Sequence, residues 1–141
     1  ETVRKLNWSP DIIHVHGWMA SLFPLYLKTY YKDEPVFENS KIVTSVYDKS
    51  FDESLNKKLV DKILFDEINE ELIKGLKDPS YNNLVKNAID FSDAIILGSQ
   101  KIPTDVQDHL NSSKKPVLNY QTRETFSETY TEFYKNEVLN Q

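Results

Sequence analysis

The sequence lacks cysteine altogether, and it holds only three glycines and six prolines among its 141 residues. The lack of cysteine excludes disulfides and thiolate metal sites, and it favours a reducing compartment such as the cytoplasm. So few glycines and prolines argue against a disordered or repetitive architecture. No apolar run approaches the roughly 20 residues of a membrane helix. We therefore expect a cytoplasmic protein that does not span a membrane.

Positive charge is also scarce. The chain has 17 lysines and arginines against 22 acidic residues, which gives a net charge of -5. The basic pairs Lys57-Lys58 and Lys114-Lys115 stand apart from one another, and no basic stripe of the kind that follows a phosphate backbone is present. We therefore expect no nucleic-acid partner.

What the sequence does contain is enough apolar material for one core, with 39% hydrophobic and 12% aromatic residues. A chain of this length suits one domain rather than two, so residues 1–141 are predicted to form a single α/β domain. Residues 1–6 are typical of the end of a helix, and the first residue is Glu1 rather than methionine. From this we expect the chain to be a piece of a longer protein.

Alternating patterns predict the arrangement of the chain. Short runs rich in Ile and Val are typical of strands buried on both faces, and they lie at residues 11–16, 41–47, 93–98 and 116–120. Helical spacing of apolar residues marks 18–31, 55–75, 81–91, 104–110 and 123–139, of which 55–75 is expected to form one amphipathic helix or two. Pro24 predicts a break, Gly75 a helix end and Ser80 a helix cap. This alternation predicts a Rossmann-like three-layer sandwich with a mostly parallel sheet.

Residues 10–20 carry the most informative pattern. They are typical of a buried strand that brings a histidine to its carboxyl end, turns at Gly17 and begins a helix. Ligands of open α/β sheets collect beside such strand ends. His14 and His16 share one strand face, but no third ligand stands at a supporting spacing, so no metal site is predicted. Trp18 either stacks on a ligand or anchors its helix to the sheet.

Other polar residues are weaker candidates. Asp48, Asp52 and Glu53 follow the second strand, where they either line a cleft or are solvated loop acids. Asp48, without paired acids after the first strand, does not make the Mg²⁺ site of a flavodoxin-like signalling domain. Ser99 has no recognisable partner histidine, so it is not predicted as a nucleophile. His109 lies on a short surface helix and is expected to be exposed.

Three segments together resemble a known family. They are His16-Gly17-Trp18-Met19 with Phe23-Pro24-Leu25, Thr44-Ser45-Val46-Tyr47-Asp48, and the stretch from Asn87 to Ser99. Their order and spacing resemble the starch and glycogen synthases, which are retaining glycosyltransferases that extend α-1,4-glucans. The resemblance spans roughly ninety residues and becomes weak after Gln100.

The resemblance implies a GT-B architecture, in which two Rossmann-like domains face each other across a cleft. It implies an α-1,4-glucan acceptor and an ADP- or UDP-glucose donor, without a metal or other cofactor. Nothing in the chain resembles the half that holds the sugar nucleotide. The chain therefore resembles the latter part of the N-terminal, acceptor-side domain, with the donor site in a missing domain.

Departures from the family pattern fall at the same cleft. Gly17 stands where the family has an acid, Met19 replaces a histidine, and Tyr47 replaces the histidine that ends the next strand. A tyrosine can hydrogen-bond a sugar hydroxyl, but it cannot be the same proton partner at neutral pH. No catalytic residue is assigned, and the isolated chain is expected to be inactive.

The predicted substrate-binding residues share the ends of the first two strands, and they are His16, Gly17, Trp18, Tyr47 and Asp48. We expect His16 and Tyr47 to emerge side by side and to frame one hollow. The alternative function is a non-catalytic domain that retains the fold and binds glucan or a partner protein.

Overall fold

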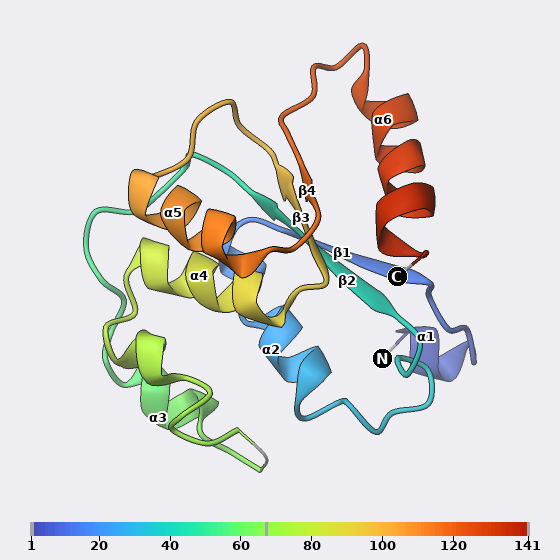
Figure 1. Cartoon of the computed structure of the whole chain (residues 1–141). Helices are drawn as coiled ribbons and strands as arrows, with labels where there is room; N and C mark the ends of the chain where they lie inside the picture. Colours follow the sequence, from blue (N-terminus) through green and yellow to red (C-terminus); the bar gives the residue numbers. More distant parts are fainter. Residues whose placement is uncertain (1, 67, 141) are drawn as a thin grey trace.

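A computed structural model describes residues 2–66 and 68–140, and within these residues four strands form one parallel sheet (Figure 1). The order along the sheet is β1-β2-β3-β4. The strands are β1 (Ile12–His16), β2 (Lys41–Val46), β3 (Ala94–Leu97) and β4 (Val117–Leu118). Each predicted strand is present, although the last is shorter than residues 116–120. All pairings are parallel, which confirms the predicted α/β class.

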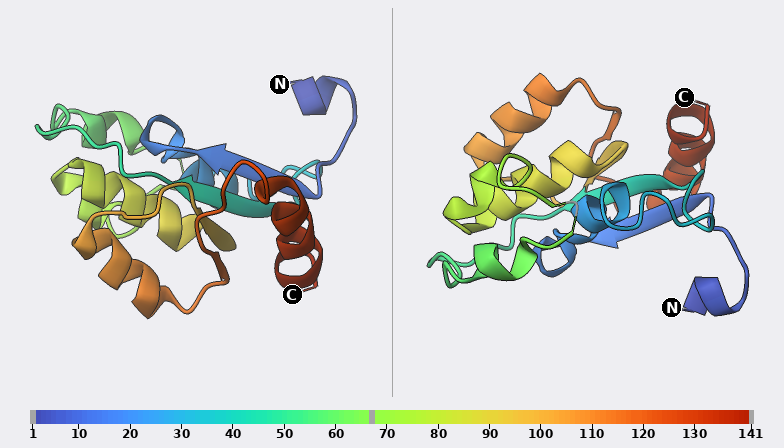
Figure 2. Two further views of the ribbon diagram at one scale, coloured as in Figure 1. Left: turned by 90° about the horizontal axis from the view of Figure 1, so that it is seen from above. Right: turned by 90° about the horizontal axis from the view of Figure 1, so that it is seen from below.

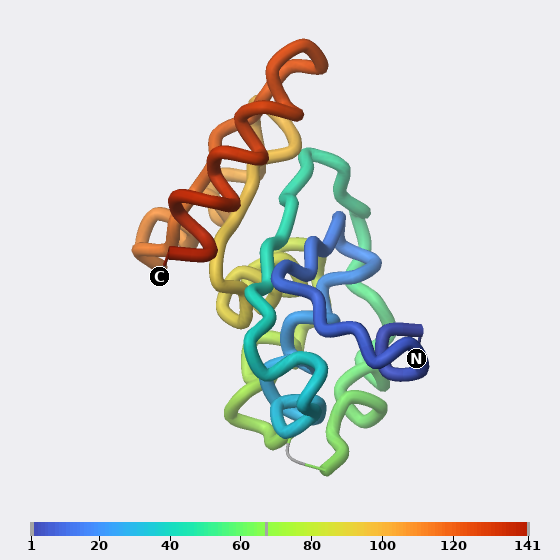
Figure 3. Tube along the Cα trace, turned by 90° about the vertical axis from the view of Figure 1, so that its right-hand side faces the viewer, coloured from blue at the N-terminus to red at the C-terminus, as the bar shows by residue number. Residues whose placement is uncertain are grey.

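Helices cover both faces of the sheet. In Figure 1, α4 (Tyr81–Phe91) and α5 (Thr104–Ser113) lie on one side of the strands, and α6 (Phe126–Phe133) lies on the other. Figure 2 shows the same layers from above and below. A π-helical turn, η3 (Tyr134–Val138), continues α6. In Figure 3 the N-terminal segment with α1 (Thr2–Lys5) and the C-terminal segment lie on opposite sides of the molecule.

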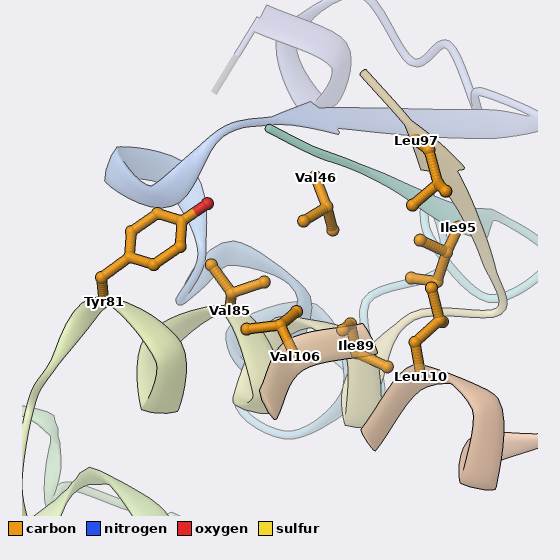
Figure 4. Close-up of a cluster of buried hydrophobic side chains, with 8 residues drawn as sticks. All are labelled: Val46, Tyr81, Val85, Ile89, Ile95, Leu97, Val106 and Leu110. Carbon is orange, nitrogen blue, oxygen red and sulfur yellow. The ribbon is translucent and has the colours of Figure 1, made fainter. Parts of the chain in front are cut away.

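The main core lies between the sheet and the helices α4 and α5 (Figure 4). Alternation along β2 and β3 points every second side chain at these helices. The buried residues of this cluster are Val46, Tyr81, Val85, Ile89, Ile95, Leu97, Val106 and Leu110. On the opposite face, Val43, Ala94 and Ile96 pack against Phe133 and Val138. Burial on both faces explains why these strands carry continuous apolar runs rather than alternating ones.

The predicted helix over residues 18–31 is divided. Trp18–Ala20 form a 3-10 turn, η1, and α2 begins at Phe23 and ends at Lys28. Pro24 lies in the first turn of α2, where a missing N–H leaves no intrahelical bond unmade. The predicted break is therefore confirmed, but Pro24 starts a helix rather than interrupting one.

The prediction of one long amphipathic helix or two over residues 55–75 was wrong for the described residues of this stretch, from which residue 67 is excluded. Residues of this stretch form a short α3 (Leu59–Ile63), turns, and the 3-10 turn η2 (Lys74–Lys77), so Gly75 lies inside a turn and does not end a helix. The backbone N–H groups of Glu71 and Leu72 donate to the side-chain oxygen of Asn69, which competes with helical bonding.

The apolar spacing in this stretch nevertheless marks burial correctly. Ile63, Ile68, Ile73 and Leu76 are buried against Leu25 and Leu84.

The remaining helices follow the prediction closely. The Ser80 hydroxyl accepts a hydrogen bond from the Asn83 N–H at 3.4 Å, which confirms the predicted cap of α4. α5 continues three residues beyond its predicted end, and Lys114 then adopts a left-handed conformation. Among the helices of the described residues, none combines the length and the apolar character that crossing a bilayer requires.

Candidate functional site

The carboxyl ends of β1 and β2 meet at the candidate site. His16 ends β1, and Tyr47 follows the last residue of β2. The ring nitrogen Nδ1 of His16 lies 3.0 Å from the hydroxyl of Tyr47, at hydrogen-bond distance. The expectation that these two side chains emerge side by side is confirmed.

A hollow of about 330 Å³ opens beside this pair. The residues that line it come from the first strand end, the loop after β2 and the start of α4, and they are His16, Gly17, Trp18, Met19, Tyr47, Lys49 and Tyr81. The structure thus brings together four of the predicted residues and leaves Asp48 outside the lining. A concave site with neutral hydrogen-bonding groups and aromatic walls suits a polyhydroxylated ligand.

Lys49 and Tyr81 were missed by the sequence reasoning. A signal for Tyr81 was available, because it is the first residue of the helix that precedes β3. In a parallel sheet such a helix begins at the carboxyl edge, which is the edge that carries the site. The Tyr81 hydroxyl donates to the backbone oxygen of Tyr47, so it also fixes the start of the loop after β2.

Gly17 makes the tight turn that the sequence predicts. Its φ of 70° lies in a region that residues with a Cβ rarely adopt. Its N–H donates to the backbone oxygen of Ser45 at 3.2 Å, which ties the turn to β2. This geometry directs the chain from the end of β1 into the residues that wall the hollow.

Trp18 takes part in both the core and the hollow. Its ring meets the edge of Phe51 with centroids 4.8 Å apart, and it packs against the main core. The predicted anchoring role is therefore confirmed. Its presence in the lining of the hollow leaves a stacking role as a proposal.

Gly98 leaves the space that the ring of Tyr47 occupies. A Cβ added at Gly98 would overlap several carbon atoms of that ring. Because Gly98 follows the last residue of β3, the ring of Tyr47 lies across the end of the neighbouring strand. A glycine directly after a buried strand was the sequence signal for this close approach.

Asp48 has a structural partner outside the hollow. The Ser99 hydroxyl donates to a carboxylate oxygen of Asp48 at 3.0 Å, and the Asp48 N–H donates to the Ser99 oxygen at 3.1 Å. This pair joins the loops after β2 and β3. Ser99 thus has an aspartate as its partner, whereas Asp52 and Glu53 are exposed loop acids.

The pKa shifts of His14, His16 and Tyr81 all favour the neutral forms of these side chains. Burial, assisted by the neighbouring His16, lowers the pKa of His14 to about 4. Burial also lowers the pKa of His16 from its ordinary value. The pKa of Tyr81 is raised by burial and then by the charge of Asp48. At neutral pH the two imidazoles and the Tyr81 phenol are therefore uncharged donors and acceptors, a character suited to the hydroxyl groups of a ligand.

His14 and His16 do share one face of β1, and their ring centroids are 4.0 Å apart. His14 nevertheless uses both ring nitrogens, with Nε2 2.8 Å from the Ser45 hydroxyl and Nδ1 2.6 Å from the Tyr134 hydroxyl. A ring with both nitrogens engaged offers no lone pair to a metal. In residues 2–66 and 68–140, no group of three or more His, Asp or Glu side chains has an arrangement that would hold an ion.

His109 differs from the prediction. Its Nε2 lies 2.6 Å from a carboxylate oxygen of Asp90, so it joins α5 to α4 rather than being merely exposed. It lies away from the hollow and plays no part in the candidate site.

Comparisons with known proteins point to starch and glycogen synthases. The sequence profile described as the starch synthase catalytic domain matches residues 1–119. The chain is 33% identical over 106 residues to a protein named glycogen synthase from Chlorobium phaeovibrioides, which is 75% of this chain and 21% of that protein. It is 30% identical over 109 residues to the glycogen synthase of Thermotoga maritima, which is 76% of this chain and 22% of that protein.

A more distant relative is the glycogen synthase of Clostridium perfringens, 25% identical over 107 residues, or 76% of this chain and 22% of that protein. The chain thus spans about a fifth of the length of these relatives. No solved structure matches the chain significantly.

Proposed function

Because the chain belongs to the starch synthase catalytic-domain family, we propose that it is part of a glycosyltransferase that extends α-1,4-glucan with glucose from a nucleotide sugar. Residues 1–141 form the latter part of the N-terminal domain, on the acceptor side of a GT-B cleft. The donor is ADP- or UDP-glucose, and its site lies in a domain outside this chain. We also propose a cytoplasmic location, which the lack of cysteine favours.

The observation that carries this proposal is the His16–Tyr47 hydrogen bond at the mouth of a hollow between two parallel strand ends. In this proposal the two side chains hydrogen-bond glucan hydroxyls, and Trp18 offers its face to the C–H surface of a glucose ring. Gly17 lets the backbone approach the glucan closely. Asp48 supports the loop after β2 through Ser99 and makes no direct contact with the sugar.

The residues around the hollow bind and orient, but they do not supply a catalytic group. No carboxylate is present among the residues that line it. Lys49 is the charged side chain in the lining. Its ammonium group can donate a hydrogen bond either to a phosphate oxygen of the donor or to a sugar hydroxyl. We therefore propose that the isolated chain does not transfer glucose.

Donor turnover by the intact gene product tests the proposed activity. We expect radiolabelled glucose to pass from ADP-glucose or UDP-glucose to glycogen or to malto-oligosaccharides. The absence of transfer from either donor would reject the enzymatic proposal. The isolated residues 1–141, tested alongside, are expected to give no transfer.

The alternative is a glucan-binding domain without catalytic function. The absence of a carboxylate from the hollow's lining favours this alternative. Affinity electrophoresis in glycogen distinguishes a binder from a non-binder, because a binder migrates more slowly. Trp18→Ala is expected to abolish the retardation, whereas Trp8→Ala is the matched control, since Trp8 is exposed and distant from the hollow. A binder that lacks transferase activity in the intact protein would establish this alternative.

A further inference from the structure

Three polar side chains contact one another beneath α6, on a face of the sheet that is otherwise apolar. We call Tyr134, His14 and Ser45 the polar row. Phe133 and Val138 pack on this face against Val43, Ala94 and Ile96. Beside these contacts, the hydroxyl of Tyr134 reaches His14 across 120 residues of sequence. Apolar contacts alone would suffice to dock α6 on the sheet. A half-buried phenol and imidazole do not add to the apolar contacts, because buried polar groups require hydrogen-bond partners.

Both ring nitrogens of His14 have hydroxyl partners. Nδ1 lies 2.6 Å from the Tyr134 hydroxyl, and Nε2 lies 2.8 Å from the Ser45 hydroxyl. A hydroxyl can donate or accept, so a neutral imidazole in either tautomer satisfies both contacts. Tyr134 and Ser45 thus hold His14 from both sides and leave its ring one orientation.

The His16 ring is held by one side-chain hydrogen bond, whereas the His14 ring is held by two. It is exposed at the end of β1, and its ring lies against that of His14 with centroids 4.0 Å apart and planes inclined by 34°. Its Nδ1 meets the Tyr47 hydroxyl at 3.0 Å, which leaves Nε2 for a ligand. The position of the His16 ring therefore depends on the ring behind it.

We propose that Tyr134 and His14 are positioning residues that set the orientation of the His16 ring and so its hydrogen bond to the glucan. The assignment of glucan as the ligand rests on the proposed function, but the coupling from Tyr134 through His14 to His16 does not. The family profile covers residues 1–119, so it does not include Tyr134 or the contact that Tyr134 makes with His14.

Tyr130 strengthens the same arrangement from one turn earlier on α6. Its ring lies 6.1 Å from that of His14 and 6.1 Å from that of Tyr134, measured between centroids. The pKa of Tyr130 is raised by burial and by Tyr47, and a hydrogen bond with Ser45 acts in the opposite direction. The rings of Tyr130 and Tyr134 therefore both lie beside His14, and the Tyr134 hydroxyl contacts it directly.

Nitrogen-15 NMR of the imidazole rings tests the coupling on the intact chain. We expect His14 to give the spectrum of one neutral tautomer at neutral pH, because both ring nitrogens are held by hydroxyl partners, and this measurement needs no variant. Tyr134→Phe removes the hydroxyl and keeps the ring. It should shift the nitrogen resonances of His14 and also those of His16, although residue 134 is not among the hydrogen-bond partners of His16. Tyr30→Phe is the matched control, since Tyr30 is exposed and packs against Tyr31 and Phe65.

Binding of maltoheptaose to the same variants supplies the functional measurement. Loss of one neutral hydrogen bond that orients His16 should weaken the affinity by roughly 3- to 10-fold in Tyr134→Phe, with no change in Tyr30→Phe. If Tyr134→Phe does not fold, His14→Asn replaces it, because the Asn amide takes the place of Nδ1 beside the Tyr134 hydroxyl but offers no ring to His16. His16 resonances should then broaden or shift.

The outcomes separate the two proposals. A mixture of His14 tautomers in the unmodified chain, or His16 resonances that stay unchanged in both variants, would overturn the positioning role. If His16 responds to Tyr134→Phe but the unmodified protein neither binds maltoheptaose nor transfers glucose, the coupling stands and the proposed function fails.

Discussion

The two faces of the sheet differ in what their side chains do. On the face covered by α4 and α5, Ile95 is fully buried and Leu97 is nearly so, and both pack in an apolar cluster. On the face covered by α6, apolar contacts share the surface with His14, Ser45 and Tyr134. The first face stabilises the fold, because burial of apolar area is the main favourable contribution to folding. Part of the second face consists of hydrogen-bonded side chains that orient the site. Substitutions on the first face should therefore change mainly the stability, and substitutions on the second face mainly the ligand affinity.

The largest expected effect comes from the apolar face. Ile95→Ala removes a fully buried side chain between the sheet and the helices, and should lower the free energy of unfolding by about 2–5 kcal/mol. Urea unfolding followed by circular dichroism measures this change. Under conditions where the variant remains folded, its affinity for maltoheptaose should match that of the unmodified chain. A loss below about 1 kcal/mol would show that this face does not dominate stability.

Gly98→Ala should affect both the site and the fold. The added methyl group displaces the ring of Tyr47 and breaks its hydrogen bond to His16. We expect a loss of at least about 10-fold in maltoheptaose affinity, with a destabilisation of about 1–3 kcal/mol. Isothermal titration calorimetry measures the affinity.

Gly75→Ala is the matched control for this substitution, because a Cβ at Gly75 meets no atom within 4 Å. It should leave the affinity unchanged. Equal affinities of the two variants would show that Tyr47 does not contribute to the site.

The pH dependence of stability should come from the polar face. His14 has a pKa of about 4 in the folded chain and an ordinary value of 6.5. Between these values the unfolded chain binds more protons, so stability is highest above pH 6.5 and falls as the pH drops toward 4. The lowered pKa of His16 acts in the same direction.

The expected contribution is about 1–2 kcal/mol, after an allowance for solvent screening of a half-buried ring. Urea unfolding at several pH values between 7 and 4.5 measures it. His14→Asn should flatten the profile relative to the unmodified chain. Parallel profiles for the two proteins would contradict the neutral state assigned to His14.

The smallest effect is expected in the loops that follow β2 and β3, at the carboxyl edge of the sheet. Ser99→Ala removes the hydrogen bonds that join the loops after β2 and β3, and should cost about 0.5–1.5 kcal/mol in thermal or urea unfolding. The maltoheptaose affinity should change by less than about 2-fold, because Asp48 lies outside the lining of the hollow. A loss as large as that of Gly98→Ala would place Asp48 in direct contact with the sugar.

The strands and α4 could be predicted because their patterns are long and because burial on both faces gives continuous apolar runs. The stretch at residues 55–75 could not, since Asn69 forms local hydrogen bonds that compete with a helix. The apolar spacing there reports burial and says little about backbone conformation. Periodicity alone cannot distinguish the two.

The candidate site shows the same limit. The meeting of His16 and Tyr47 was predictable, because adjacent parallel strands end at one edge. The Tyr134–His14 contact was not, because it joins residues 120 positions apart through a helix whose docking no local pattern specifies.

The central claim is that the ends of β1 and β2 bind α-1,4-glucan, and an NMR titration with maltoheptaose tests it most directly. The chain carries its own internal controls, since it has three histidines and two tryptophans. We predict that the His16 imidazole and Trp18 indole resonances shift in a saturable manner, while those of His109 and Trp8 stay unchanged. Saturation that moves His109 or Trp8 instead, or no shift at any of these residues, would contradict the account.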